Sequence, residues 1–161
     1  MPTHVQTAAY DKAVVLAEAG QYQEAFDQIQ HYLRESPDDA EALNDAAVLL
    51  HCLNRSADGI PYLERAHQVG GNQPEILWNL AETYLAEARA DQAKPLFALM
   101  EEDEVLSVDL LNQAANVFLN QGQLQDAMDM LNWSLRLAPD QEVLKPMVTV
   151  IEHKIKEGGQ G

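Results

Sequence analysis

The sequence predicts an all-α fold in which short helices stack in pairs. Residues 108–141 carry two apolar stripes at helical spacing, separated by Gln121 and Gly122. The same pattern recurs when a window of 34 residues is moved back along the chain to begin at residues 6, 40 and 74. Because two helices of about 13 residues leave one side of each stripe in water, a pair needs a neighbouring pair to cover it. We therefore expect a solenoid of four helix–turn–helix repeats.

Four columns of equivalent positions support this periodicity. Small residues recur at the inter-helix turn and early in the second helix, where helices must approach closely, and large residues recur where helices interlock. The columns are Gly20, Asn54, Ala88 and Gly122; Ala25, Gly59, Ala93 and Ala127; Leu16, Leu50, Tyr84 and Phe118; and Ile29, Leu63, Phe97 and Leu131. This period with this alternation of small and large residues resembles the tetratricopeptide repeat (TPR) family. The resemblance implies a right-handed TPR solenoid.

The chain divides into elements in a simple order. Four repeats are expected at residues 6–39, 40–73, 74–107 and 108–141. Residues 142–157 form a further apolar stripe with polar residues opposite, which is typical of a helix that caps a solenoid. Disordered tails are expected at residues 1–5 and 158–161.

Composition and charge limit the class of partner. The chain has 161 residues, of which 47% are hydrophobic, and this suits one domain with a core of ordinary size. A formal net charge of -16 argues against binding to nucleic acid or to anionic membranes, and it favours basic or neutral protein partners. The lone Cys52 excludes an internal disulfide, and the sequence has neither a signal-peptide pattern nor a long apolar run. We expect a cytoplasmic protein.

No motif indicates catalysis. His51 and Cys52 are adjacent, but neighbours on a helix point about 100 degrees apart, and no acid or amide is placed to orient the histidine. The histidines lack metal-binding spacing, and no glycine-rich phosphate loop is present. We therefore expect no enzyme activity, no metal and no cofactor.

The TPR resemblance places function on the concave side, which the first helix of each repeat lines. Window positions 2, 5, 6, 9, 12 and 13 supply 24 residues there, of which seven are acids and none is Lys or Arg. Family members that hold acidic tails of chaperones use a clamp of Lys, Asn and Arg. The equivalent positions here are Tyr10, Val14, Asp45, Glu75 and Asn79. Because Asp45 and Glu75 would repel a carboxylate, this clamp is excluded.

Amides, acids and one indole on this side are the candidate binding residues. The column Asp11, Asp45, Asn79 and Gln113 resembles the amide ladder with which some TPR proteins hold an extended peptide backbone. Trp78 is expected to face the same side and to contact a Lys or Arg side chain. The predicted peptide-binding residues are Asp11, Asn44, Asp45, Trp78, Asn79, Glu82, Asn112, Gln113 and Asn116. Two plainer interpretations stay open, namely a hydrophilic inner surface without a ligand and a Trp78 that packs between repeats.

Three functions are compatible with these features. The first is a protein-interaction scaffold that binds a basic or neutral peptide or helix. The second is a dedicated bacterial chaperone resembling the type III secretion translocator chaperones, which are small acidic TPR proteins. The third is the TPR arm of a larger enzyme such as a glycosyltransferase. Weak homodimerisation is also expected, because Val14, Val15 and Ile29 lie near an atypical first helix and are expected to be thinly covered.

Overall fold

Residues 4–158, the part of the chain that the computed structural model describes, form nine helices and no strand. The helices fall into two compact units, one ending at Glu87 and the other beginning at Ala88. The all-α prediction is confirmed. The tails expected at residues 1–5 and 158–161 lie largely outside the described residues.

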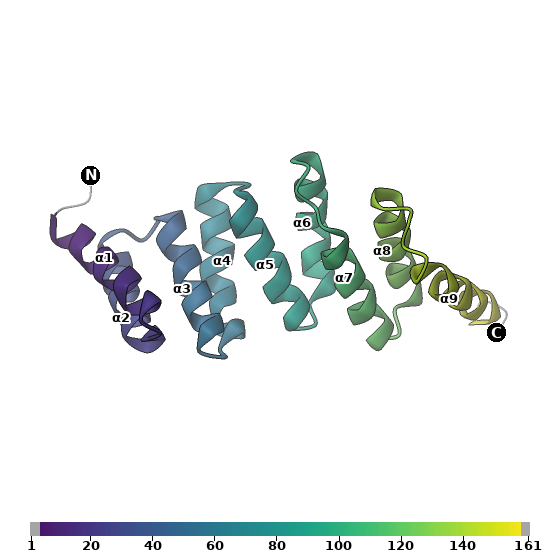
Figure 1. Ribbon diagram of the computed structural model, residues 1–161, viewed down its shortest axis with the longest axis horizontal. Helices are drawn as coiled ribbons and strands as arrows, with labels where there is room; N and C mark the ends of the chain where they lie inside the picture. Colours follow the sequence, from purple (N-terminus) through teal and green to yellow (C-terminus); the bar gives the residue numbers. More distant parts are fainter. Residues whose placement is uncertain (1–3, 159–161) are drawn as a thin grey trace. The chain divides into compact units, whose positions relative to one another are not determined.

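The first unit contains five helices (Figure 1). They are α1 (His4–Glu18), α2 (Tyr22–Glu35), α3 (Ala40–Cys52), α4 (Ser56–Gly70) and α5 (Pro74–Ala86). Helices α1 and α2 pack as one hairpin and α3 and α4 as the next, while α5 packs against α4 as the first helix of a further repeat. Asp39 caps α3, since its side chain accepts a hydrogen bond from the backbone N–H of Ala42.

The second unit contains four helices. They are α6 (Ala90–Glu102), α7 (Val108–Asn120), α8 (Leu124–Leu137) and α9 (Leu144–Gly158). Helices α7 and α8 form a hairpin, and α9 packs on α8 through the buried Ile151. The boundary between the units falls at the inter-helix turn of the third predicted repeat, so that its two helices belong to different units.

The column of small residues marks close helix contacts within the units. Ala25, Ala93 and Ala127 have no exposed surface. At the equivalent Gly59 on α4, an added Cβ would lie 3.3 Å from the backbone Cα of Ala47 on α3. The backbone cannot yield as a flexible side chain can, so this position requires a small residue. The sequence-based assignment of the column is therefore confirmed.

The turn column shares one backbone conformation. Gly20, Asn54, Ala88 and Gly122 have φ values of 75, 58, 57 and 74 degrees, which lie in the left-handed region. Glycine adopts this region freely, and asparagine tolerates it better than most residues. Ala88 is the exception, because its Cβ makes the conformation unfavourable by about 1–2 kcal/mol.

Second helices of neighbouring repeats are tied together by polar side chains. In the first unit, Arg65 on α4 pairs with Asp38, which follows α2. In the second unit, Lys94 on α6 lies 2.7 Å from a carboxylate oxygen of Asp126 on α8. Glu101 on α6 accepts hydrogen bonds from the Trp133 indole at 3.0 Å and from Arg136 at 2.6 Å. The basic side chains named here thus support packing on the second helices.

The exposure of the first hairpin corrects one sequence-based expectation. Val14 is 40% exposed and Val15 is 64% exposed, as an incompletely covered first helix requires. Ile29, which was expected to be thinly covered with them, is only 1% exposed because it faces the core shared by α1, α2 and α3.

Candidate functional site

The first helices of the first unit present one acidic face. Residues at the chosen window positions recur at spacings of three and four, which places them on the same side of each helix. Lys12 is the one Lys or Arg in α1, α3 and α5. We call this surface the first-helix face, and its residues are Asp11, Val14, Glu18, Glu41, Asp45, Val48, Glu75, Trp78, Asn79 and Glu82. Six of these ten side chains are carboxylates.

Tyr10 and Asp45 join α1 to α3 on this face. The Tyr10 hydroxyl donates a hydrogen bond of 2.6 Å to Oδ2 of Asp45. Burial, and then the neighbouring Asp45 carboxylate, raise the pKa of Tyr10, so the hydroxyl keeps its proton. Burial also raises the pKa of Asp45, while the bond from Tyr10 partly opposes that change. Asp45 is therefore a partly desolvated carboxylate held in a fixed position.

Asn44 joins α3 to α5 one position away. Its Nδ2 donates to Oε1 of Glu75 at 3.2 Å, and its Oδ1 accepts from Nδ2 of Asn79 at 2.9 Å. Asn44 is only 4% exposed. Both ends of its amide are used within the protein, so Asn44 positions Glu75 and Asn79 and does not itself face a partner.

The other candidate residues of the first unit are more accessible. Asp11 and Glu82 are exposed, and Trp78 and Asn79 are half-buried. Trp78 is thus neither a fully buried wedge nor a free surface side chain. The Thr83 hydroxyl donates a hydrogen bond of 2.7 Å to the backbone carbonyl of Asn79, one turn earlier in α5.

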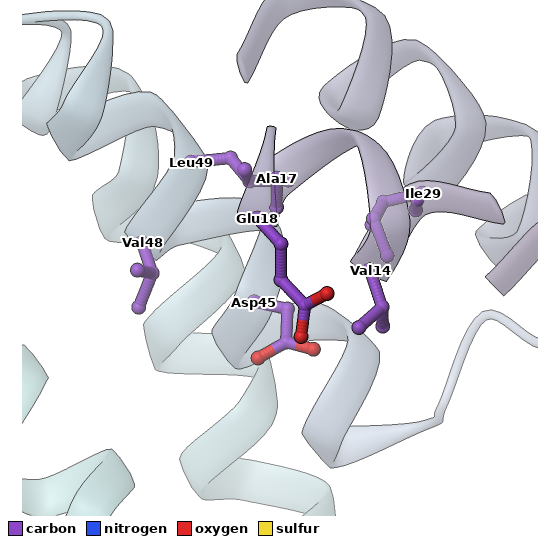
Figure 2. Close-up of a pocket in the computed structure, with 8 residues that line it drawn as sticks. Val14, Ala17, Glu18, Ile29, Asp45, Val48 and Leu49 are labelled. Carbon is purple, nitrogen blue, oxygen red and sulfur yellow. The ribbon is translucent and has the colours of Figure 1, made fainter. Parts of the chain in front are cut away.

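A pocket opens between α1 and α3, with α2 beneath it (Figure 2). We call it the valine pocket, and its volume is about 190 Å³. It is lined by Ala13, Val14, Ala17, Glu18, Ile29, Asp45, Val48 and Leu49. Figure 2 shows the carboxylates of Glu18 and Asp45 in the space between Val14 and Val48. The pocket therefore combines an apolar floor with two acidic side chains.

The sequence analysis did not single out the valines of this pocket as binding residues. Val14 and Val48 occupy window position 9, where the later repeats carry Glu82 and Asn116. Each valine is 40% exposed. An apolar residue in a column that is otherwise polar and solvent-facing was the signal that could have identified them.

The candidate residues of the second unit form a separate set on α7. Gln113 and Asn116 are exposed, and Asn112 is half-buried. Nδ2 of Asn112 donates to Oε1 of Gln141 at 3.0 Å, and Gln141 is in turn held by the carbonyls of Ser134 and Ala138. Oδ1 of Asn112 is buried and has no hydrogen-bond partner. Unlike Asn44, Asn112 thus leaves its acceptor unused.

Nothing in the described range resembles a metal or catalytic centre. No group of three or more His, Cys, Asp or Glu side chains within residues 4–158 could hold a metal ion. Cys52 is exposed, and Nδ1 of His51 lies 2.9 Å from the hydroxyl of Ser56. None of the helices described is long and apolar enough to cross a bilayer.

Solved structures resemble the chain over most of its length. YrrB, described as a TPR protein with an unusual peptide-binding site, is 23% identical, with 94% of this chain and 74% of that chain covered and a TM-score of 0.70. A MamA structure is 13% identical, with 92% and 81% covered and a TM-score of 0.74. A second MamA structure is 19% identical, with 98% and 91% covered and a TM-score of 0.70. No protein-family model and no curated protein sequence matches the chain.

Proposed function

The chain has the fold of the TPR proteins, and from this premise we propose that it is a non-catalytic protein-interaction scaffold. Its partner is a basic or neutral peptide or helix that docks on the first-helix face. The observation that carries the proposal is the charge of that face, which combines six carboxylates with no Lys or Arg. A basic segment gains electrostatic attraction there, whereas an acidic segment is repelled.

Two further features support the proposal. The described peptide-binding site of YrrB shows that a protein of this fold can hold a peptide. The hydrogen bonds among Tyr10, Asp45, Asn44 and Glu75 fix the carboxylates of the first unit before any partner arrives. A preorganised surface loses less conformational entropy on binding than a mobile one. Cytoplasmic location and weak homodimerisation belong to the same proposal as secondary expectations.

The indole of Trp78 provides the test. In a Trp133→Phe background, we expect a Lys- and Arg-rich peptide to change Trp78 fluorescence at low salt. We expect its affinity to fall as salt is added, since screening weakens attraction between exposed charges. An acidic peptide of the same length is the control and should leave the fluorescence unchanged.

A double variant identifies the surface. Trp78→Ala combined with Glu82→Lys should abolish binding of the basic peptide, because it removes the aromatic contact and reverses one charge. Glu157→Lys on α9 is a matched charge reversal at an exposed site away from this face and should retain most of the affinity. Full binding by the double variant would contradict docking on the first-helix face.

A further inference from the structure

We propose that the valine pocket holds one aliphatic side chain of the partner, and that the next residue of the partner is Lys or Arg. This inference rests on the proposed function and specifies the peptide sequence that the first-helix face selects.

The size and lining of the pocket indicate the aliphatic group. Its volume of about 190 Å³ is several times the roughly 30 Å³ that a water molecule occupies in the liquid. Ala13, Ile29 and Leu49 form a buried apolar floor, and the flanking Val14 and Val48 are each 40% exposed. An aliphatic side chain inserted here would remove its own apolar surface and that of both valines from water. A polar side chain would lose hydrogen bonds with water and find few partners on the floor.

The two acids at the pocket indicate the neighbouring cation. Glu18 is exposed, while Asp45 is partly desolvated and accepts the hydrogen bond from Tyr10. Among the residues that the structure describes, neither carboxylate forms an ion pair. Lys12 lies on the same helix but does not line the pocket. A Lys or Arg beside the inserted side chain would supply the missing positive charge.

Charge also decides against a second copy of this chain as the occupant. Each copy carries a formal charge of -16, and the pocket itself presents two acids. Two such surfaces repel each other at moderate ionic strength. The occupant is therefore a segment of a different, basic protein.

Four short acetylated peptides test the inference in the full-length protein. They share one polar host sequence and differ only at two adjacent positions, which are Leu-Arg, Leu-Glu, Ser-Arg or Ser-Glu. Valine methyl groups are labelled with carbon-13 and followed by NMR during titration. We expect Leu-Arg to shift the Val14 and Val48 methyl signals and to bind about tenfold or more tightly than Ser-Arg, from the burial of one leucine side chain. Equal affinity for Leu-Arg and Ser-Arg would overturn the inference.

Matched variants separate the pocket from the rest of the face. Val48→Ser should lower the affinity for Leu-Arg about tenfold, since the serine covers less of the inserted side chain. Val15→Ser is its control, because Val15 lies on α1, is 64% exposed and does not line the pocket. Ala17→Met should have the same effect as Val48→Ser by filling the space. Unchanged circular dichroism of each variant confirms that the fold is intact.

The acids have their own matched pair. Glu18→Gln should weaken Leu-Arg and narrow its advantage over Leu-Glu, whereas Glu24→Gln, an exposed change on α2, should alter neither. Retention of the full Leu-Arg advantage in Glu18→Gln with Asp45→Asn would overturn the role assigned to the acids.

The remaining outcomes distinguish this inference from the proposed function. A fluorescence response of Trp78 to basic peptides without methyl shifts at Val14 and Val48 would overturn the pocket assignment and leave the proposed function standing. Absence of any response to the basic peptides would count against both. Concentration-dependent shifts of the two valines without peptide, together with a dimer in sedimentation, would instead identify a second copy as the occupant.

Discussion

The two units use equivalent repeat positions for different purposes. In the first unit, the first helices carry six carboxylates, and hydrogen bonds run from α1 to α3 and from α3 to α5. In the second unit, α7 carries one acid, Asp109, among the amides Asn112, Gln113, Asn116 and Asn120. The strongest polar links of the second unit instead join the second helices α6 and α8. A shared repeat fold therefore does not distribute charge and binding potential evenly along the chain.

The comparison teaches that one side chain can differ in role because of its neighbour. Asn44 and Asn112 occupy the same window position on α3 and α7. Asn44 finds an acid and an amide on the next first helix, whereas Asn112 contacts Gln141 in the segment before α9. The identity of the following element thus decides whether the asparagine joins two helices or ties a loop.

The largest expected effect tests whether the two units share one packing rule. Ala127→Arg in the second unit and Ala25→Arg in the first should each destabilise the protein by about 4 kcal/mol or more, because each puts an unpaired charge at a fully buried position. Urea unfolding followed by far-UV circular dichroism measures the loss. Asp129→Arg, at an exposed position of α8, is the control. An unchanged midpoint for either alanine variant would contradict the close-contact role of that column.

The asparagine pair should show a smaller difference. Asn44→Leu leaves Glu75 and Asn79 without their partner, and we expect a loss of about 2 kcal/mol. Asn112→Leu removes an acceptor that is already unpaired, so the loss should stay below about 1 kcal/mol. The free energy of unfolding in urea measures both. Equal losses would remove the distinction drawn between the two asparagines.

Relief of the Ala88 turn should be smaller again and stabilising. Ala88→Gly removes about 1–2 kcal/mol of backbone strain and adds about 0.5–1 kcal/mol of conformational entropy to the unfolded chain. We expect a net gain of roughly 0.5 kcal/mol, seen as a higher thermal midpoint. Gly122→Ala at the equivalent turn should have the opposite sign. A loss of stability in Ala88→Gly would show that the methyl group makes contacts that outweigh the strain.

The smallest effects concern pH, and they should have opposite signs in the two units. Burial raises the pKa of Asp45 above its ordinary 3.8, so its stabilising contribution is present below that value and is lost as the pH rises through the folded-state pKa. Arg136, and then Trp133, lower the pKa of Glu101 below its ordinary 4.5. The contribution of Glu101 is therefore present above 4.5 and is lost as the pH falls through the folded-state pKa.

Amide variants measure these contributions. The thermal midpoint of Asp45→Asn relative to the unmodified protein should rise as the pH is raised above 3.8, because the amide carries no charge to desolvate. That of Glu101→Gln should fall as the pH is raised toward 4.5 and stay low above it. Parallel pH profiles for the two variants would contradict the opposite environments of the two carboxylates.

The sequence predicted the repeat architecture because that architecture depends on periodic local signals. The small column at Ala25, Gly59 and Ala127 and the interlocking column at Ile29 and Phe97 are buried as expected. Such positions recur every 34 residues with the same neighbours, so a single chain provides several independent observations of each.

Features that depend on one particular neighbour were less predictable. The burial of Asn44 requires Glu75 and Asn79 at matching positions of the next helix, and periodicity alone does not indicate such pairs. The valine pocket requires a gap between α1 and α3 that no sequence column specifies. Ala88 adopts a conformation that its residue type disfavours, because the turn geometry is imposed by the helices on both sides.

The hydrogen bonds that build the first-helix face have a consequence for synthesis of the chain. Tyr10 and Asp45, Asn44 and Glu75, and Asn79 and Asn44 are separated by 35, 31 and 35 positions. Contacts of such short range favour rapid folding, and each can form as soon as the next first helix has left the ribosome. The first unit, with its acidic face and pocket, can therefore be complete while the second unit is still being translated. A partner that binds this face could then engage the nascent chain.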